Sequence, residues 1–337
     1  MKRRPFTMLA VAMVAFALVV YLGLGSLRHG TVPAAKPPDL TRALAAIDGT
    51  MYLTQRGGLY QLKGDRFTEL QPVGGGWTQP VGSPDKSSLA IVKRAADWSD
   101  VYLIDRSGQP IKQLTHDQGT DVVSDHWAFY PSFSGDGSSL FYSFDSPKDG
   151  FRVDMSIWSQ PVAAGAARRW TVPADYTGGD SEAFQVGSGG LIFTQYALQS
   201  DGQIRAQVRL QSGPFGFSRA LTRPEDDCSQ PTLSPDGTRL ALICTGGQQV
   251  GRLEVAAFDG ANLGPLQVLV DGQLCAAPAW QPDGQALAYL APGGQAGRFQ
   301  LWLLPLQPVG RLETLQPRQL TSALDFDATS RIAWFQA

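Results

Sequence analysis

Pro231-Thr232-Leu233-Ser234-Pro235-Asp236-Gly237, followed by Leu240-Ala241, decides the fold because the chain repeats it. Close variants begin at Pro80, Pro131 and Pro278. The matching aspartates are Asp85, Asp136, Asp236 and Asp283. They are spaced 51, 100 and 47 residues apart, so the middle step covers two periods. Repeats of about 20–50 residues are typical of solenoids and propellers. Pro, Asp and Gly each favour tight turns, so we expect these four aspartates to have a structural role.

Each turn introduces a series of short strands. An apolar run follows directly, for example residues 240–244, and a second run such as 101–105 comes next. A third ends in Gln-Leu-Thr, as at 113–115. Together with the segment that leads into the turn, these runs predict four strands per period, which is one blade of a β-propeller.

The two remaining blades can also be located. Residues 183–193 have the strand–turn–strand shape but have lost Pro and Asp. The C-terminal residues 331–337 match an innermost strand, and the globular part begins at Ile47 with a turn and a second strand. The two chain ends therefore share one blade, which leaves no open sheet edge. The sequence predicts an all-β, six-bladed propeller over residues 47–337, closed by a C-terminal inner strand.

This repeat resembles that of the TolB-like β-propeller family, whose blades carry Pro-x-Trp-Ser-Pro-Asp-Gly and end in Leu-Thr. The resemblance covers roughly residues 47–337 and implies the fold rather than a function, since such repeats occur in unrelated proteins. TolB has an additional N-terminal domain that engages periplasmic partners. We expect no such domain in this chain, so the Tol–Pal role does not carry over.

The N-terminus predicts export. Met1-Lys2-Arg3-Arg4 is followed by an uncharged apolar stretch from Pro5 to Gly25, long enough to span a bilayer. The basic start favours a cytoplasmic N-terminus, and a cleaved signal peptide is the alternative. We expect a transmembrane helix over 1–25 and a Pro-containing spacer over 26–46. The propeller would then lie on the periplasmic side of a bacterial cytoplasmic membrane, held by a single membrane-spanning segment.

The cysteines permit a disulfide in that compartment. Cys228 and Cys275 each stand three residues before their repeat's Pro, at equivalent positions on adjacent inner strands. We expect a Cys228–Cys275 bridge. The alternative is that all three cysteines, Cys244 included, are small buried hydrophobic residues.

Catalytic motifs are scarce. The chain lacks Gly-x-Ser-x-Gly, His-Glu-x-x-His and a P-loop, and it contains three His and one Asn. Glu182 is the one carboxylate on the expected inner strands. We therefore expect no catalytic residue, metal or cofactor. The net charge of −2 and the absence of a basic arm argue against nucleic-acid binding.

Acidic and aromatic residues concentrate in the loops that join blades. Loops on a rigid scaffold are where binding usually resides, and such a surface would attract a basic protein segment or a cation. The alternative is ordinary turn chemistry. The expected binding face consists of Trp98, Asp117, Asp121, Asp125, Trp127, Tyr130, Asp175, Tyr176, Asp180 and Glu182.

Three functions are compatible with these features. The favoured one is a non-catalytic protein-interaction scaffold or accessory subunit in the cell envelope, with a protein partner. The second is a propeller enzyme of the lactonase or sugar-dehydrogenase type that acts at the channel mouth. The third is a sensor for a small ligand or glycan that uses Trp98, Trp127 and Tyr130.

Overall fold

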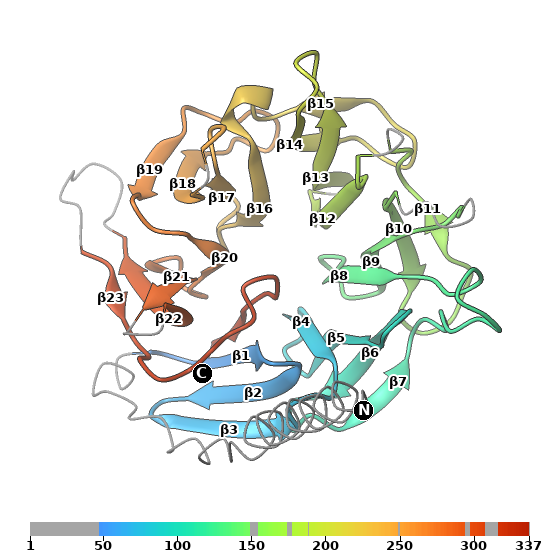
Figure 1. The fold of residues 1–337 in the computed structure, drawn as a ribbon, viewed down its shortest axis with the longest axis horizontal. Coiled ribbons are helices and arrows are strands. Elements are labelled where there is room, and N and C mark those ends of the chain that lie inside the picture. The colour runs from blue at the N-terminus through green and yellow to red at the C-terminus, as the bar shows by residue number, and fades with distance from the viewer. Residues whose placement is uncertain are drawn as a thin grey trace, which may run out of the picture. The chain divides into compact units, whose positions relative to one another are not determined.

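The protein folds as a ring of six blades around a central channel (Figure 1). The computed structural model describes residues 47–148, 154–173, 177–187, 189–248, 250–293, 297–306 and 316–336. Each blade is a four-stranded antiparallel sheet, which confirms the predicted all-β six-bladed propeller. The expected membrane segment (1–25) and spacer (26–46) lie outside the described residues. Within the described ranges, no helix has the length and apolar character needed to cross a bilayer.

In each blade the strands follow one another from the channel to the rim. Blade 1 comprises β24 (Ala333–Phe335), β1 (Thr50–Gln55), β2 (Gly58–Lys63) and β3 (Arg66–Gln71). Blade 2 comprises β4 (Trp77–Gly82), β5 (Ser88–Arg94), β6 (Ser99–Asp105) and β7 (Pro110–Gln113). Blade 3 comprises β8 (Ala128–Phe133), β9 (Ser139–Phe144), β10 (Ser156–Pro161) and β11 (Arg168–Arg169).

The other three blades have the same order. Blade 4 comprises β12 (Asp180–Val186), β13 (Gly190–Leu198), β14 (Ile204–Gln211) and β15 (Ser218–Ala220). A 3₁₀ turn, η2 (Pro224–Asp226), then leads to blade 5, with β16 (Cys228–Leu233), β17 (Arg239–Cys244), β18 (Arg252–Ala257) and β19 (Gln267–Val270). Blade 6 comprises β20 (Ala276–Trp280), β21 (Ala286–Gly293), β22 (Arg298–Pro305) and β23 (Arg318–Gln319).

The ring closes where the sequence predicted. The C-terminal strand β24 pairs antiparallel with β1, with Trp334 opposite Met51. The Trp334 indole Nε1 donates to the carbonyl of Asp48 at 2.9 Å. Gly49 has φ +102°, and a Cβ there would lie 2.0 Å from the Phe335 carbonyl oxygen, so this position requires glycine. Both ends of the propeller are thereby paired within one blade.

The repeated turn is held by its own side chains. The Ser234 hydroxyl donates to Asp236 Oδ1 at 2.6 Å, and this carboxylate accepts the Thr238 N–H at 3.1 Å. The Arg239 N–H returns to Ser234 Oγ at 2.9 Å. The hydrogen bond from Ser234 is the main cause that lowers the pKa of Asp236 to about 2. Asp85, Asp136 and Asp283 accept equivalent backbone N–H groups.

The hydrophobic core lies between neighbouring blades. Val92 of blade 2 shares a buried cluster with Leu140 of blade 3, and Ile192 of blade 4 shares one with Leu242 of blade 5. Each of these side chains is fully buried. Burial of such a side chain contributes about 1.5–3 kcal/mol, so blade-to-blade packing stabilises the ring at every junction.

The disulfide differs from the prediction. Cys228 is bonded to Cys244, and Cys275 is a free, buried thiol. Cys228 on β16 and Cys244 on β17 stand directly opposite each other in the same blade, with Cα atoms 4.0 Å apart. The expected Cys228–Cys275 bridge was wrong because Cys228 has this nearer partner on the adjacent strand, whereas Cys275 precedes the inner strand of the next blade.

Candidate functional site

Two faces of the ring must be distinguished. The turns between first and second strands of several blades gather around one mouth of the channel, where Ser83, Ser234 and Pro282 line a common cavity. We call this side the turn face. Because strands alternate in direction, the links between second and third strands and between blades lie on the opposite side, which we call the loop face.

The channel wall is built from five equivalent bulges. Each inner strand β4, β8, β12, β16 and β20 has a register shift against its neighbour. At each shift one non-glycine residue has positive φ: Gln79 (55°), Tyr130 (52°), Glu182 (59°), Gln230 (53°) and Ala277 (49°). Non-glycine residues rarely adopt this conformation, and it persists only where the surroundings enforce it.

Hydrogen bonds between blades enforce these bulges. The backbone N–H of Tyr130 donates to Gln79 Oε1 at 2.7 Å, and that of Gln79 donates to Ser330 Oγ at 2.8 Å. Further round the ring, the N–H of Gln230 donates to Glu182 Oε2 at 2.7 Å and that of Ala277 to Gln230 Oε1 at 2.6 Å. A side chain of one blade therefore satisfies the bulge of the next, and the channel lining is rigid.

A charged group lies within this lining. The Arg331 guanidinium is 5.4 Å from the centre of the Tyr130 ring and donates to the carbonyl of Pro131 at 3.3 Å. Burial lowers the pKa of Arg331, while Glu182 and Tyr130 raise it, and an arginine stays protonated in this range. Burial together with the Glu182 carboxylate raises the pKa of Tyr130 to about 12. Arg331, Tyr130 and Glu182 thus form one electrostatic unit.

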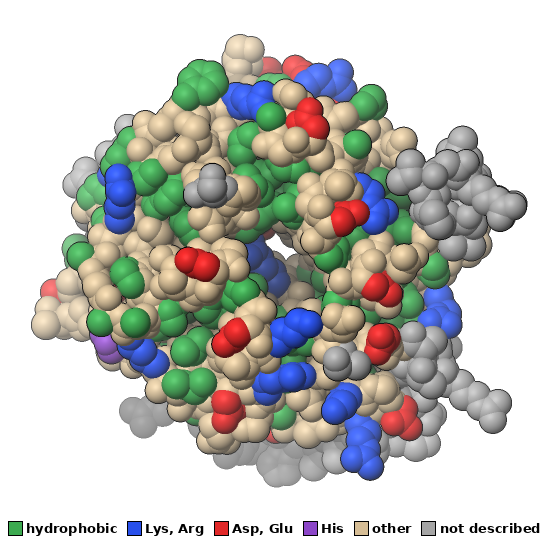
Figure 2. All heavy atoms as spheres, turned by 180° about the vertical axis from the view of Figure 1, so that it is seen from behind, with side chains coloured by type: hydrophobic (Ala, Val, Ile, Leu, Met, Phe, Trp, Pro, Cys, Tyr) green, Lys and Arg blue, Asp and Glu red, His purple; other side chains and the backbone are tan. Residues whose placement is uncertain are grey.

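The channel opens into a cavity of about 520 Å³ on the turn face. Arg331, Tyr130 and Glu182 line it together with Lys86, Trp280 and Gln230. Figure 2 shows the central opening of one face, with Lys and Arg side chains on and beside its wall and Asp and Glu side chains standing singly around the ring. Aromatic, amide and cationic groups and the Glu182 carboxylate therefore converge on a space of ligand size.

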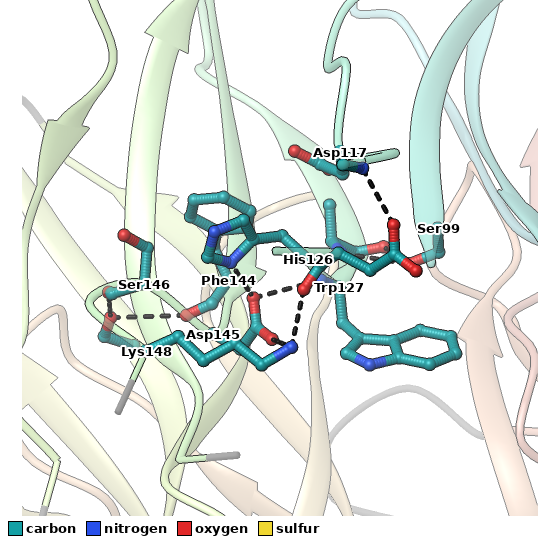
Figure 3. A network of polar contacts seen from close by, with 12 residues as sticks. Ser99, Asp117, His126, Trp127, Phe144, Asp145, Ser146 and Lys148 are labelled. Atoms are coloured by element: carbon teal, nitrogen blue, oxygen red, sulfur yellow. Dashed lines mark hydrogen bonds and ion pairs between the residues drawn. The ribbon is translucent and has the colours of Figure 1, made fainter. Parts of the chain in front are cut away.

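The acidic loop between blades 2 and 3 was expected to be exposed, but most of its carboxylates are buried (Figure 3). Asp145 is fully buried, and its Oδ1 lies 2.8 Å from His126 Nδ1 and accepts the Trp127 N–H at 3.0 Å. The Asp117 N–H donates to Asp100 Oδ1 at 2.8 Å. Burial is the main cause that raises the pKa of the Asp117 carboxyl to about 7.

The other two aspartates of this loop accept backbone N–H groups within the loop and so stabilise its conformation. Asp125 is buried, and its Oδ1 accepts the Gly119 N–H at 2.8 Å. Asp121 is exposed and accepts the N–H groups of Val123 and Ser124 in its own turn. The expected acidic rim is therefore reduced in this loop to one exposed carboxylate.

The other expected site residues are dispersed. Trp98 is half-buried in the β5–β6 loop, and Trp127 stacks on Phe129 at 5.6 Å. Asp180 is buried, and the Gln195 amide donates to it at 3.1 Å. Tyr130 and Glu182 line the channel and not the loop face. Asp175 and Tyr176 lie outside the described residues.

Comparison with solved structures identifies the fold. TolB from Acinetobacter baumannii is similar at 19% sequence identity and a TM-score of 0.63, over 85% of this chain and 66% of that one. The chain has the TolB-like six-bladed propeller fold. No protein-family model matches the sequence, and no curated protein matches it either.

Proteins with different activities also match this fold. Hydrazine synthase from Kuenenia stuttgartiensis matches at 11% identity and a TM-score of 0.59, over 84% of this chain and 48% of that one. A puromycin-hydrolyzing peptidase from Mycobacterium tuberculosis matches at 16% sequence identity and a TM-score of 0.50, over 84% of this chain and 47% of that one. At these identities the likeness concerns the fold alone.

Several residues of the channel in this TolB-like propeller were missed from the sequence. They are Gln230 and Arg331, which line the cavity together with Lys86 at its mouth, and Gln79, whose side chain accepts the Tyr130 N–H at the bulge. A signal was present for two of them: Gln79 and Gln230 each directly precede the Pro of their repeat. Tyr130 and Ala277 occupy the same place before Pro131 and Pro278, so the residue before each repeat Pro marks the channel wall.

Proposed function

We propose that this propeller is a non-catalytic binding protein that takes up a segment of a partner protein at the channel mouth of its turn face. The observation that carries the proposal is the cavity of about 520 Å³, whose lining includes Arg331, Lys86 and aromatic side chains. Binding sites are typically cavities of roughly 300–1,000 Å³, largely preformed, with a few fixed polar groups.

The chemistry of the lining suggests which segment would fit. Arginine has five N–H donors in a planar fork that suits a carboxylate, and Arg331 uses one of them on Pro131. Lys86 adds a second positive charge at the mouth, where its Nζ donates to Gln336 Oε1 at 3.3 Å. We infer that the segment presents a carboxylate, from an acidic side chain or a chain terminus, next to apolar residues.

The absence of catalysis is part of the proposal. Of the described residues, no three His, Cys, Asp or Glu side chains lie close enough together to hold a metal ion. The carboxylate in the cavity, Glu182, already accepts hydrogen bonds from Thr194 and the Gln230 backbone. We propose that Glu182 serves to hold the Gln230 bulge and takes no part in proton transfer.

We further propose a location in the bacterial envelope. The basic N-terminus and the uncharged stretch from Pro5 to Gly25 favour a membrane anchor with an exported propeller. The Cys228–Cys244 disulfide supports the same location, since disulfides persist mainly in oxidising compartments.

A small-ligand sensor is the second candidate. The volume of the channel cavity favours it, because such a space would also accommodate a small anionic molecule. The third candidate, a propeller enzyme, would require substrate turnover at the same mouth.

The test is an affinity purification of the full-length protein from its native membrane in mild detergent, followed by mass spectrometry. Three variants accompany the wild type: Arg331→Gln, Lys86→Glu and Lys63→Glu. Lys63 is an exposed lysine at the end of β2, away from the cavity, and serves as the matched control. Thermal unfolding of each purified variant shows whether it has folded.

A stoichiometric partner that is lost with Lys86→Glu and Arg331→Gln but kept with Lys63→Glu would support the proposal. A partner kept by all three variants would move the surface away from the channel. If no partner copurifies and a small anion raises the melting temperature of the wild type but not of Arg331→Gln, the sensor would replace the scaffold. Turnover of a lactone or sugar substrate would establish the enzyme.

A further inference from the structure

The hairpin between β14 and β15 exposes two phenylalanines. Phe215 has 62% and Phe217 has 77% of its surface accessible, the latter being the highest value for a large hydrophobic side chain among the described residues. The hairpin reads Ser212-Gly213-Pro214-Phe215-Gly216-Phe217. Exposed apolar side chains clustered in this way mark interaction surfaces.

The hairpin is fixed in this exposed position. The Phe215 N–H donates to the carbonyl of Trp170 in blade 3 at 2.8 Å. The Gln211 amide donates to the same carbonyl at 2.9 Å and to that of Gly213 at 2.7 Å. Phe215 itself has φ +56°, an uncommon conformation for a bulky residue. These bonds hold the two rings outward at the cost of a strained backbone.

The hairpin lies on the turn face. Gln211 at its base pairs with Leu191, near the turn that joins β12 to β13. The N-terminal part of the sequence joins the propeller on this same face, since Ile47 directly precedes Asp48 and Gly49 of the closing turn. The chain therefore enters the propeller on the side of the ring that carries Phe215 and Phe217.

Three arginines lie near the hairpin. Arg209 donates at 2.9 Å to the hydroxyl of Ser218, the residue that directly follows Phe217. Arg219 on β15 donates to Asn262 Oδ1. Arg168 is exposed two residues before Trp170. Exposed acids stand on both faces of blades 3 to 5: Asp121, Asp201 and Glu225 on the loop face, and Asp136, Asp236 and Asp259 on the turn face.

We propose that Phe215 and Phe217 insert into a phospholipid bilayer that carries anionic headgroups, so that the turn face rests on the membrane. Aromatic rings flanked by arginines are suited to the interface, where the rings reach the acyl boundary and the cations meet phosphate. The inference rests in part on the proposed anchor. It would leave the channel mouth facing the membrane, within reach of a segment close to the bilayer.

The test uses the full-length chain reconstituted into vesicles of phosphatidylcholine, with and without phosphatidylglycerol. A polarity-sensitive fluorophore is attached to Phe217→Cys, or to Leu198→Cys as the control. Leu198 is similarly exposed, at 63%, but ends β13 on the loop face of the same blade. Quenching by lipid-borne spin labels reports contact with the bilayer, and flotation of the vesicles reports the anchor separately.

The expected result is several-fold stronger quenching at position 217 than at 198, increased by phosphatidylglycerol and reduced by adding Phe215→Asp. Equal, weak quenching at both positions in protein that floats would overturn the inference while leaving the anchor intact. Stronger quenching at 198 would place the opposite face on the bilayer and also overturn it. A probe at 217 that becomes shielded only when a partner protein is added would assign the hairpin to that partner. Protein that fails to float would refute the anchor instead, and the same probes added with the protein to preformed vesicles would then decide the lipid contact.

Discussion

Gln230 and Ala277 are joined across a blade junction: the Gln230 side-chain Oε1 accepts the backbone N–H of Ala277 at 2.6 Å. Both residues have positive φ and both line the channel. Glu182 caps Gln230 in the same way, so the strained positions of successive blades support one another. A ligand in the channel would meet a wall already held in place, which reduces the entropy that binding costs.

Replacing Gln230 with Ala should destabilise the propeller by about 1–3 kcal/mol, because the buried N–H of Ala277 would lose its acceptor. Urea unfolding of the purified protein measures the loss in the free energy of unfolding. Gln248→Ala is the control, since Gln248 is exposed in the β17–β18 loop and its loss should change stability by less than about 0.5 kcal/mol. Equal effects of the two changes would contradict a role for the channel hydrogen bond.

The disulfide makes a second prediction. Replacing both Cys228 and Cys244 with Ala should lower the free energy of unfolding by about 3 kcal/mol, because the bond closes a loop with a sequence separation of 16 residues. Cys275→Ala should cost less, since it removes one buried sulfur and no cross-link. Peptide mapping without reductant should recover a peptide pair in which Cys228 is linked to Cys244. A peptide linking 228 to 275 would restore the pairing first expected from the sequence.

The repeated turn can be tested at Asp236. Asp236→Ala removes the acceptor for Ser234 and Thr238 and should destabilise the protein by about 1 kcal/mol. Asp236→Asn keeps an acceptor oxygen and should cost less. Thermal unfolding at pH 7 compares the two variants, and an equal loss in both would indicate that the charge of the carboxylate, and not its hydrogen bonds, stabilises the turn.

The blades could be predicted because their signals are local. Ser234, Asp236 and Gly237 form the turn through neighbours in the sequence, so the same letters reproduce the same turn wherever they recur. The closing blade followed from comparing its two ends with complete copies of the repeat. The disulfide could not be predicted in this way because two cysteines on adjacent strands, 16 positions apart, carry no repeat signal.

The site was harder to predict because it depends on the closed ring. Arg331 reaches Pro131 across 200 positions of sequence, and only closure brings it beside Tyr130 and Glu182. Within one loop, Asp117 is buried and Asp121 is exposed, although the two lie four positions apart. Burial of a loop residue depends on how the loop folds over its neighbours, and residue type does not reveal it.

The buried carboxyl of Asp117 should make the stability of the protein depend on pH. Its carboxyl has a pKa raised from 3.8 to about 7, mainly by burial and further by the nearby Asp100 and Asp145. Between these two values the folded protein holds a proton that the unfolded chain has released. The free energy of unfolding therefore falls as the pH rises through this window, by on the order of 2–4 kcal/mol from this group, and then levels off above about pH 7.

Asp117→Asn cannot ionise and should escape that loss. We expect the variant to gain stability relative to the wild type between pH 5 and pH 8, as measured by urea unfolding at both values. Asp180, whose pKa burial raises to about 6, acts in the same direction in both proteins and cancels from the comparison. Asp121→Asn, at an exposed carboxylate of the same loop, should keep a constant difference from the wild type across this range. If Asp117→Asn also differed from the wild type by a constant amount, the Asp117 carboxyl would have to be ionised in the fold, and water or a cation would have to stabilise its charge.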